Sequence, residues 1–235
     1  MRKWTTAFLT FAVMIPVIAC SSPKVNDVTM QEAHSGAVDT QAVSDDIDIT
    51  EEPQSIEEKI LIAYFTWAEN AAVPSDVDAI ASASVQKPGN VAQMASWIRQ
   101  EVGGDLFSIR VEEPYPFDYD ECLNRASDEK AENARPALIE TVSDLSGYDV
   151  VFLGYPNWWY SAPMPVFSFL EENDLSDKRV VLFCSHGTGG LASSVKDISA
   201  VLPDSQVESN VLGVYRDDIP QSQETIQNWL KEIGY

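Results

Sequence analysis

Residues 150–163 read VVFLGYPNWWYSAP, an uninterrupted apolar run followed at once by a cluster of aromatic residues. A short, continuous apolar run bounded by turn residues is typical of a strand that is buried on both faces of a sheet. A core does not need two tryptophans and a tyrosine directly after such a strand, and an exposed turn does not favour them. The stretch therefore predicts a strand whose carboxyl end carries a binding surface.

The same kind of apolar run recurs along the chain and alternates with segments of helical periodicity. The expected strands are 60–65, 106–111, 150–154, 180–184 and 211–215. The expected helices are 91–102, 119–133, 166–170, 191–202 and 226–233. Strands buried on both faces that alternate with amphipathic helices predict an α/β fold with a doubly wound parallel sheet.

Ligands of such a sheet bind beyond the carboxyl ends of its strands, so the residues that follow each strand are the candidate site. Thr66-Trp67 follow the first strand, Pro156–Tyr160 the third and Ser185–Gly190 the fourth. Glycines let a backbone approach a ligand closely, and aromatic faces stack on a ring. Hydroxyls, glycines and aromatic side chains at one edge predict a ligand with a phosphate and a flat ring system.

The phosphate requires donors at the start of a helix. The chain delays that helix, because a long insertion separates Thr66 from the turn Gly89-Asn90 at which the amphipathic pattern begins. Acidic residues of the insertion would repel a phosphate that they approached; they are Glu69, Asp76 and Asp78. We therefore expect the phosphate at Gly89-Asn90, with a hydroxyl from Thr66.

Eight segments, in this order along the chain, resemble the bacterial flavodoxin-like branch that has an insertion in its first phosphate loop. They are ILIAYFTWAEN, KPGNVAQMASWI, GGDLFSI, PYPFDYDEC, ENARPAL, DVVFLGYPNWW, APMPVFSFLE and FCSHGTGGLASSVKDI. The resemblance implies a flavodoxin-like five-stranded parallel sheet of order 2-1-3-4-5 and a noncovalently bound FMN.

The resemblance also implies which residues contact FMN. The phosphate site would contain Thr66, Trp67, Gly89, Asn90 and Val91. The isoalloxazine ring would be flanked by Pro156, Asn157, Trp158, Trp159 and Tyr160. Its other side would be closed by Ser185, His186, Gly187, Thr188, Gly189 and Gly190. Adjacent side chains diverge, so one of the two tryptophans is expected to pack under a neighbouring element, and Trp159 is favoured as the one that stacks on the ring.

Three residues depart from the family pattern. Val91 replaces a threonine, Tyr160 stands where glycine is expected, and His186 stands where small or hydroxyl residues are common. With the acidic insertion, Val91 and Tyr160 favour an alternative function, in which the fold has lost FMN and serves as a lipoprotein binding module or scaffold. If FMN is present, the protein is an electron carrier or an FMN-dependent oxidoreductase, and no side chain needs to be catalytic.

Other chemistry is poorly supported by the sequence. Ser185-His186 suggests a hydrolase only superficially, because a triad needs a base that a third group orients. The chain has two histidines, and one of them, His34, lies in the acidic segment before the domain, which gives no plausible zinc site. The acidic string at 118–121 is expected to begin a helix, because carboxylates favour that end of the helix dipole.

The first residues, MRKWTTAFLTFAVMIPVIAC, have the basic start and apolar run of a secretory signal. Val17-Ile18-Ala19-Cys20 resembles the lipobox of bacterial lipoproteins, which implies a signal peptide at 1–19 and lipid on Cys20. The alternative is an ordinary signal peptide whose cleavage site holds a cysteine. We expect an exported protein that is lipid-anchored to the bacterial cell membrane or envelope.

Residues 20–58 are expected to be a disordered acidic tether to a domain at 59–235, because residues 21–58 hold ten acids, one base and no aromatic residue. Since residues 1–20 carry a net charge of +2 and residues 21–58 carry −9, the domain carries −15 of the total −22. This charge argues against nucleic acid as a partner. The expected partner is a redox protein or a small-molecule electron acceptor. Cys122 and Cys184 could pair in an exported protein, but Cys184 lies in an apolar run and is expected to be a buried thiol.

Overall fold

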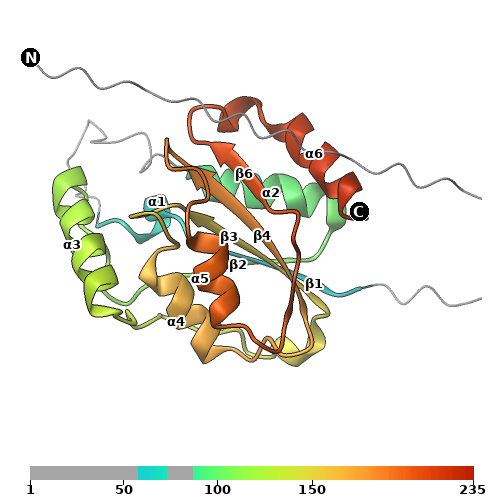
Figure 1. Cartoon of the computed structure of the whole chain (residues 1–235), viewed down its shortest axis with the longest axis horizontal. Coiled ribbons are helices and arrows are strands. Elements are labelled where there is room, and N and C mark those ends of the chain that lie inside the picture. The colour runs from blue at the N-terminus through green and yellow to red at the C-terminus, as the bar shows by residue number, and fades with distance from the viewer. Residues whose placement is uncertain (1–57, 73–86) are drawn as a thin grey trace, which may run out of the picture. The chain divides into compact units, whose positions relative to one another are not determined.

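A parallel β-sheet with helices on both faces forms the body of the domain (Figure 1). The structure is a computed structural model that describes residues 58–72 and 87–235. The expected signal peptide, the tether up to residue 57 and residues 73–86 of the insertion lie outside the described residues.

The sheet has the predicted strand order. The strands are β1 (Ile60–Tyr64), β2 (Asp105–Ser108), β3 (Val150–Pro156), β4 (Arg179–His186), β5 (Gln206–Val207) and β6 (Leu212–Tyr215). They run β2-β1-β3-β4-β5, every pairing is parallel, and β6 also pairs with β4. The predicted flavodoxin-like order 2-1-3-4-5 is therefore confirmed, but the sheet has six strands rather than the predicted five, because β5 and β6 both pair with β4 at the fifth position.

The edge beside β4 consists of two short strands in succession. β5 pairs with the start of β4 at Arg179 and Val180, and β6 pairs with its carboxyl-terminal half. Directly after β5, Glu208 N donates to Val180 O at 2.8 Å, and the Glu208 carboxylate forms an ion pair with Arg179 at 2.8 Å. The strand expected at 211–215 is β6, whereas the two residues of β5 are too few to show a period in the sequence.

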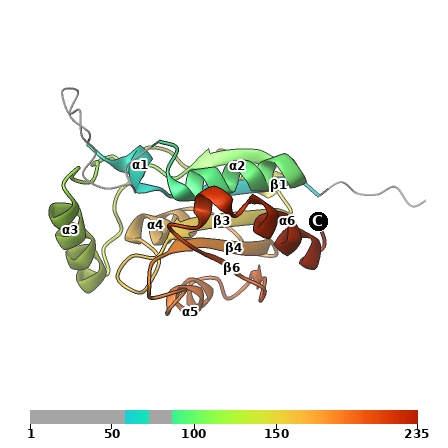
Figure 2. The same ribbon diagram turned by 90° about the horizontal axis from the view of Figure 1, so that it is seen from above.

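The helices form a layer on each face of the sheet, as Figures 1 and 2 show. One face is covered by α2 (Asn90–Val102) and α6 (Gln223–Glu232), and the other by α4 (Met164–Glu172) and α5 (Ser194–Ala200). Short 3₁₀ turns, η2 (Leu145–Gly147) and η3 (Ile219–Gln221), precede β3 and α6. Residues of β1 alternate between the two cores, with Leu61 and Ala63 on one side and Ile60 and Ile62 on the other. In the part of the chain that the structure describes, no helix is both long and apolar enough to cross a membrane.

A short helix, α1 (Trp67–Asn70), follows β1 and was not predicted. The buried Asn70 side chain donates to Thr66 O at 2.9 Å and Ile109 O at 3.0 Å, and it accepts from Val111 N at 2.9 Å. One amide group thus closes α1 and joins it to the chain that follows β2. Four residues carry no readable helical period, which is why the sequence did not reveal this helix.

Helix α3 (Tyr119–Glu132) lies beyond the end of the sheet at which α1 is found (Figure 1). Asp118 caps it by accepting from Asp120 N at 2.9 Å and Glu121 N at 3.0 Å, so the acidic string does begin a helix. Only Cys122 and Ala126 of this helix are buried. Helix α3 is therefore a polar helix with a narrow face of small side chains toward the domain.

Candidate functional site

A cavity of about 430 Å³ lies at the carboxyl ends of β1, β3 and β4. This is the edge at which doubly wound sheets bind ligands, and the volume suits a small molecule. Every residue predicted to contact the cofactor lines the cavity except Gly89 and Gly190. The predicted residues in the lining are Thr66, Trp67, Asn90, Val91, Pro156, Asn157, Trp158, Trp159, Tyr160, Ser185, His186, Gly187, Thr188 and Gly189.

The two predicted glycines that do not line the cavity support its walls. A Cβ on Gly89 would lie 2.1 Å from Thr66 Oγ1, so glycine is what lets the start of α2 approach the end of β1. Gly190 has a φ of 59°, and its carbonyl accepts a hydrogen bond from the Asn157 side chain. That bond joins the loop after β3 to the loop after β4.

The start of α2 forms one end of the cavity. Gln93 N donates to Gly89 O at 2.9 Å, so the N–H groups of Asn90 and Val91 come before the first bond of the helix ladder. The Asn90 side chain donates to Arg216 O at 3.1 Å and lies 3.5 Å from Ser185 Oγ. The Val91 side chain is 1% exposed and packs in the core, so this residue can offer only its N–H to a ligand. Free N–H groups and the helix dipole make this end suitable for an anion.

Trp67 lines the cavity, but its indole N–H is not available for a phosphate. It donates to Pro116 O at 3.2 Å, and the ring packs edge-on against Trp158 with centroids 6.5 Å apart. Trp67 was expected to contact the phosphate, but its side chain has no free hydrogen-bond donor for this purpose.

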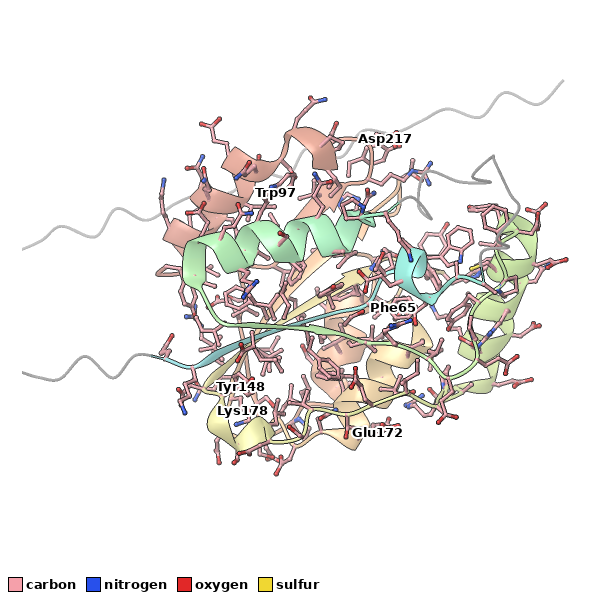
Figure 3. All side chains as sticks on the ribbon, turned by 180° about the vertical axis from the view of Figure 1, so that it is seen from behind. Phe65, Trp97, Tyr148, Glu172, Lys178 and Asp217 are labelled. Atoms are coloured by element: carbon pink, nitrogen blue, oxygen red, sulfur yellow. The ribbon has the colours of Figure 1, made fainter. Side chains whose placement is uncertain are left out.

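Trp158 is the tryptophan of the pair that packs against the body of the domain. Its ring meets Phe65 edge-on at 5.5 Å and Tyr115 edge-on at 5.2 Å. Phe65, labelled in Figure 3, is completely buried. The prediction that one of the two tryptophans packs under neighbouring elements is confirmed, and Trp159 is the one left at the surface, 39% exposed.

Trp159 and Tyr160 occupy the tip of a tight hairpin. Trp158 N donates to Ser161 O at 2.9 Å and Ser161 N donates to Trp158 O at 3.0 Å. Trp159 has a φ of 49° and Tyr160 a φ of 65°, the left-handed pair of a two-residue hairpin turn that Asn-Gly would normally fill. Tyr160 thus departs from the expected glycine at a position where the backbone favours glycine.

Contacts on both sides hold this turn. The Trp159 indole N–H donates to Leu123 O on α3 at 2.9 Å, and Lys130 of the same helix donates to Trp159 O. Ser193, beside the start of α5, donates to Tyr160 O from its N–H at 3.1 Å and from its hydroxyl at 2.7 Å. The hairpin therefore connects α3 with α5 across the cavity.

Two parts of the cavity lining were not predicted from the sequence: one wall and one positively charged side chain. Helix α3 contributes a wall, and the loop after β6 contributes Arg216; the missed lining residues are Tyr119, Cys122, Leu123, Ala126 and Arg216. On α3, the missed residues fall three or four positions apart, which places them on one helical face. That spacing was readable, but nothing in the sequence shows which element the face meets.

Both cysteines of the domain are free and buried, so they do not form a disulfide. Burial raises the pKa of the Cys122 thiol to about 12, and Arg125 opposes that shift only partly. Burial also raises the pKa of Cys184. Both thiols therefore stay protonated at neutral pH, which agrees with the expected inert role of Cys184.

The electrostatics of the cavity differ from those of the domain around it. Among its nineteen lining residues are one arginine and no aspartate or glutamate. Glu69, which follows β1, instead accepts hydrogen bonds from Ser108 Oγ and from Tyr64 OH at 3.3 Å. Burial, with Glu69, raises the pKa of Tyr64 to about 12. This acid of the insertion is therefore held by other groups, whereas Asp76 and Asp78 lie outside the described residues.

Ser185 and His186 do not form a hydrolase pair. Ser185 Oγ lies near Asn90, while His186 Nδ1 lies 2.8 Å from Gly187 O. Neighbouring residues of a strand point to opposite faces, which separates the two side chains. Over residues 58–72 and 87–235, no cluster of histidine, cysteine or acidic side chains could hold a metal ion.

Comparison with known proteins identifies relatives of this chain. The sequence model of the flavodoxin family matches residues 77–233. A flavoprotein candidate from Bacteroides eggerthii DSM 20697 is 29% identical, over 76% of this chain and 99% of that one, with a TM-score of 0.58. A second candidate, from Bacteroides uniformis ATCC 8492, is 24% identical, over 74% and 98%, with a TM-score of 0.57. No curated protein sequence matches the chain.

The cavity fits the cofactor that the resemblance implies. It offers a helix start for a phosphate, aromatic side chains for a flat ring and no carboxylate among its described lining residues. The strand order and the match of the family model over most of the domain agree with this chemistry. The chain belongs to the flavodoxin family, whose cofactor is FMN.

Proposed function

We propose that the chain holds FMN in this cavity and works as a redox protein attached to a membrane outside the cytoplasm. The observation that carries the proposal is the composition of the cavity. A domain with a net charge of −15 has a cavity whose described lining contains no acidic residue, a helix start at one end and aromatic side chains at the other. A flat, negatively charged ligand uses all of these features.

The side chains of the cavity bind and orient, and none has to act as acid, base or nucleophile. The cofactor itself accepts and donates electrons when it is bound. Asn157 is fixed by its backbone N–H bond to Ser185 O at 2.8 Å and by its side-chain bond to Gly190 O, so it would offer a bound ring a rigid contact. The aromatic residues around Trp158 exclude water from one side of the cavity.

The electron acceptor is a redox protein or a small molecule. Trp159 and Tyr160 are 39% and 66% exposed, so the hairpin tip is accessible to either kind of partner. The acidic surface of the domain would favour a basic protein partner.

The membrane attachment rests on the lipobox-like sequence that ends in Cys20. Replacing the lipid acceptor, Cys20→Ser, should release the protein from membranes or block its processing. Unchanged partitioning and unchanged mass of the variant would rule out the lipid anchor and leave the FMN proposal intact.

The absorption spectrum of the purified full chain tests the cofactor. We expect flavin absorbance as purified or after FMN is added, with quenching of flavin fluorescence on binding. Absence of both at high micromolar FMN would favour the alternative, a flavin-free lipoprotein scaffold.

A further inference from the structure

We infer that Arg216 recognises the phosphate of the flavin and makes the cavity select FMN over riboflavin. This inference rests on the proposed function. It concerns a residue that sequence reasoning did not single out, on the loop between β6 and η3. Asp217, the next residue, is labelled on that loop in Figure 3.

The backbone of Arg216 is fixed at the helix end of the cavity. Arg216 N donates to His186 O at 2.8 Å, which continues the pairing of β6 with β4. Arg216 O accepts from the side chain of Asn90, the first residue of α2, at 3.1 Å. The arginine is therefore tied both to the end of β4 and to the helix start at which a phosphate is expected.

The guanidinium group is available to a ligand. The Arg216 side chain is 54% exposed, and it has no hydrogen-bond acceptor among the described residues. Its one ion-pair contact in that part of the chain is with Asp217, with 3.7 Å between Nε and Oδ1, and Asp217 is itself 71% exposed. Such an exposed pair is weak, so a phosphate could displace the carboxylate.

The neighbouring residues explain why a cation is useful here. Val91 buries its side chain and provides no hydroxyl, and the Asn90 side chain is already engaged. A domain with a net charge of −15 also repels a phosphate at long range. Arg216 is the one lysine or arginine among the described residues that line the cavity, and a guanidinium can bind two phosphate oxygens at once.

The test is a comparison of FMN and riboflavin, which differ in the phosphate alone. Dissociation constants of the full chain and of Arg216→Gln are measured by quenching of flavin fluorescence. We expect the variant to bind FMN about tenfold more weakly, or roughly 1.4 kcal/mol, and riboflavin within about twofold of the parent. Adding salt should weaken FMN binding more for the parent than for the variant, because salt screens the attraction between Arg216 and the phosphate, which only the parent has.

A second variant that is expected to tighten FMN binding distinguishes a specific effect from a general loss of folding. Asp217→Asn removes the competing carboxylate and should tighten FMN binding by about twofold without changing riboflavin. Arg99→Gln is the matched control, because Arg99 lies in the last turn of α2, far from its start, and should change neither ligand. The urea midpoint without ligand should be the same for Arg216→Gln as for the parent, since the bonds that hold residue 216 are made by its backbone.

The outcomes separate this inference from the proposed function. If the parent binds neither flavin, the proposed function is wrong and the role of Arg216 is wrong with it. If the parent binds both flavins and Arg216→Gln keeps the parent ratio of FMN to riboflavin affinity, only the role of Arg216 is overturned. Equal weakening of both ligands would also overturn it.

Discussion

The two ends of the cavity are built in different ways. The helix end, formed by Thr66, the start of α2 and Arg216, consists of regular elements brought close by a glycine. Its cap residue, Gly89, has a φ of −65°, which is unstrained. The aromatic end, formed by the hairpin Trp158–Ser161 and by α3, places two large side chains in left-handed backbone conformations.

This contrast in backbone strain predicts that the aromatic end binds the ring at the expense of the stability of the fold. Residues that keep unfavourable backbone conformations persist when their surroundings fix them, and such residues cluster at binding sites. Here the fixing groups are the bonds of Trp159 to Leu123 and of Tyr160 to Ser193. We therefore expect changes at the helix end to act on phosphate recognition and on packing, and changes at the aromatic tip to act on ring binding.

The largest predicted effect separates the two tryptophans of the aromatic end. Trp158→Ala should lower the free energy of unfolding by about 2–4 kcal/mol, because it removes a half-buried indole from a cluster of aromatic rings. Trp159→Ala should cost less than about 1 kcal/mol of stability, since that side chain is 39% exposed. Urea unfolding without ligand measures both values.

For binding of the flavin ring, we expect Trp159→Ala to have a larger effect than Trp158→Ala. Trp159→Ala should weaken FMN and riboflavin equally, by about 1–3 kcal/mol if the indole stacks on the ring. Fluorescence titration of both flavins checks this. A Trp159→Ala variant that retains full affinity would show that Trp158, or neither tryptophan, contacts the ring.

The next prediction concerns the close approach at the helix end. Gly89→Ala should lower the free energy of unfolding by about 1–3 kcal/mol, because the new Cβ would overlap the Thr66 side chain, 2.1 Å away, and meet Ala68 Cβ at 3.0 Å. It should also weaken FMN more than riboflavin, since the helix start would move away from the phosphate. Gly147→Ala, whose nearest neighbouring atom lies 4.0 Å away, is the control and should change neither property. Equal weakening of both flavins would show that the phosphate does not sit at this end.

Most of the fold could be predicted because its three central strands are long apolar runs. β1, β3 and β4 could be read directly, and the loops that follow them contribute most of the cavity lining. α1 and β5 could not, since segments of four and two residues carry no period.

The missed parts of the site depend on tertiary placement. The face of α3 with Cys122 and Ala126 could have packed on any element, and its position at the cavity follows from contacts with the hairpin tip. Arg216 joins the site because β6 pairs with the carboxyl-terminal half of β4, which brings its loop to the start of α2. Neither relation is local in sequence.

A smaller effect is expected from the carboxylate that supports the hairpin. Asp197 accepts from Ser161 Oγ at 2.7 Å and from Ser193 Oγ at 2.6 Å. Burial alone would raise the pKa of Asp197, but these two hydroxyls, with Lys130, hold it below its ordinary value. A lowered pKa in the folded state means that the ionised group stabilises the fold above the unfolded pKa of about 3.9, and that this stabilisation is lost as the pH falls below it.

Asp197→Asn should therefore lower the free energy of unfolding at pH 7 by less than about 1 kcal/mol, because solvent screens this partly exposed group, and the difference from the parent should shrink as the pH falls below about 3.9. Urea unfolding at pH 7, 5, 4 and 3 measures it. A difference that stays constant over this range would show that the ionised carboxylate is not what holds the hairpin.

The smallest effect is a gain in stability at the expense of binding. Tyr160 has a φ of 65° and is 66% exposed, so its side chain adds strain and buries little surface. Tyr160→Gly should raise the free energy of unfolding by about 0.5–1 kcal/mol, because glycine adopts this conformation without a Cβ clash. The same change should weaken FMN by about threefold, less than 1 kcal/mol, since the tyrosine lines the cavity.

Asp177→Gly is the matched control, because Asp177 has a φ of 62° and lies outside the cavity; it should add stability without affecting FMN. Its gain should be the smaller of the two, since aspartate tolerates the left-handed region better than tyrosine. Thermal unfolding and FMN titration of both variants decide the matter: a Tyr160→Gly protein that is less stable than its parent would mean that the hairpin is not strained, and that the two ends of the cavity do not differ in the way described.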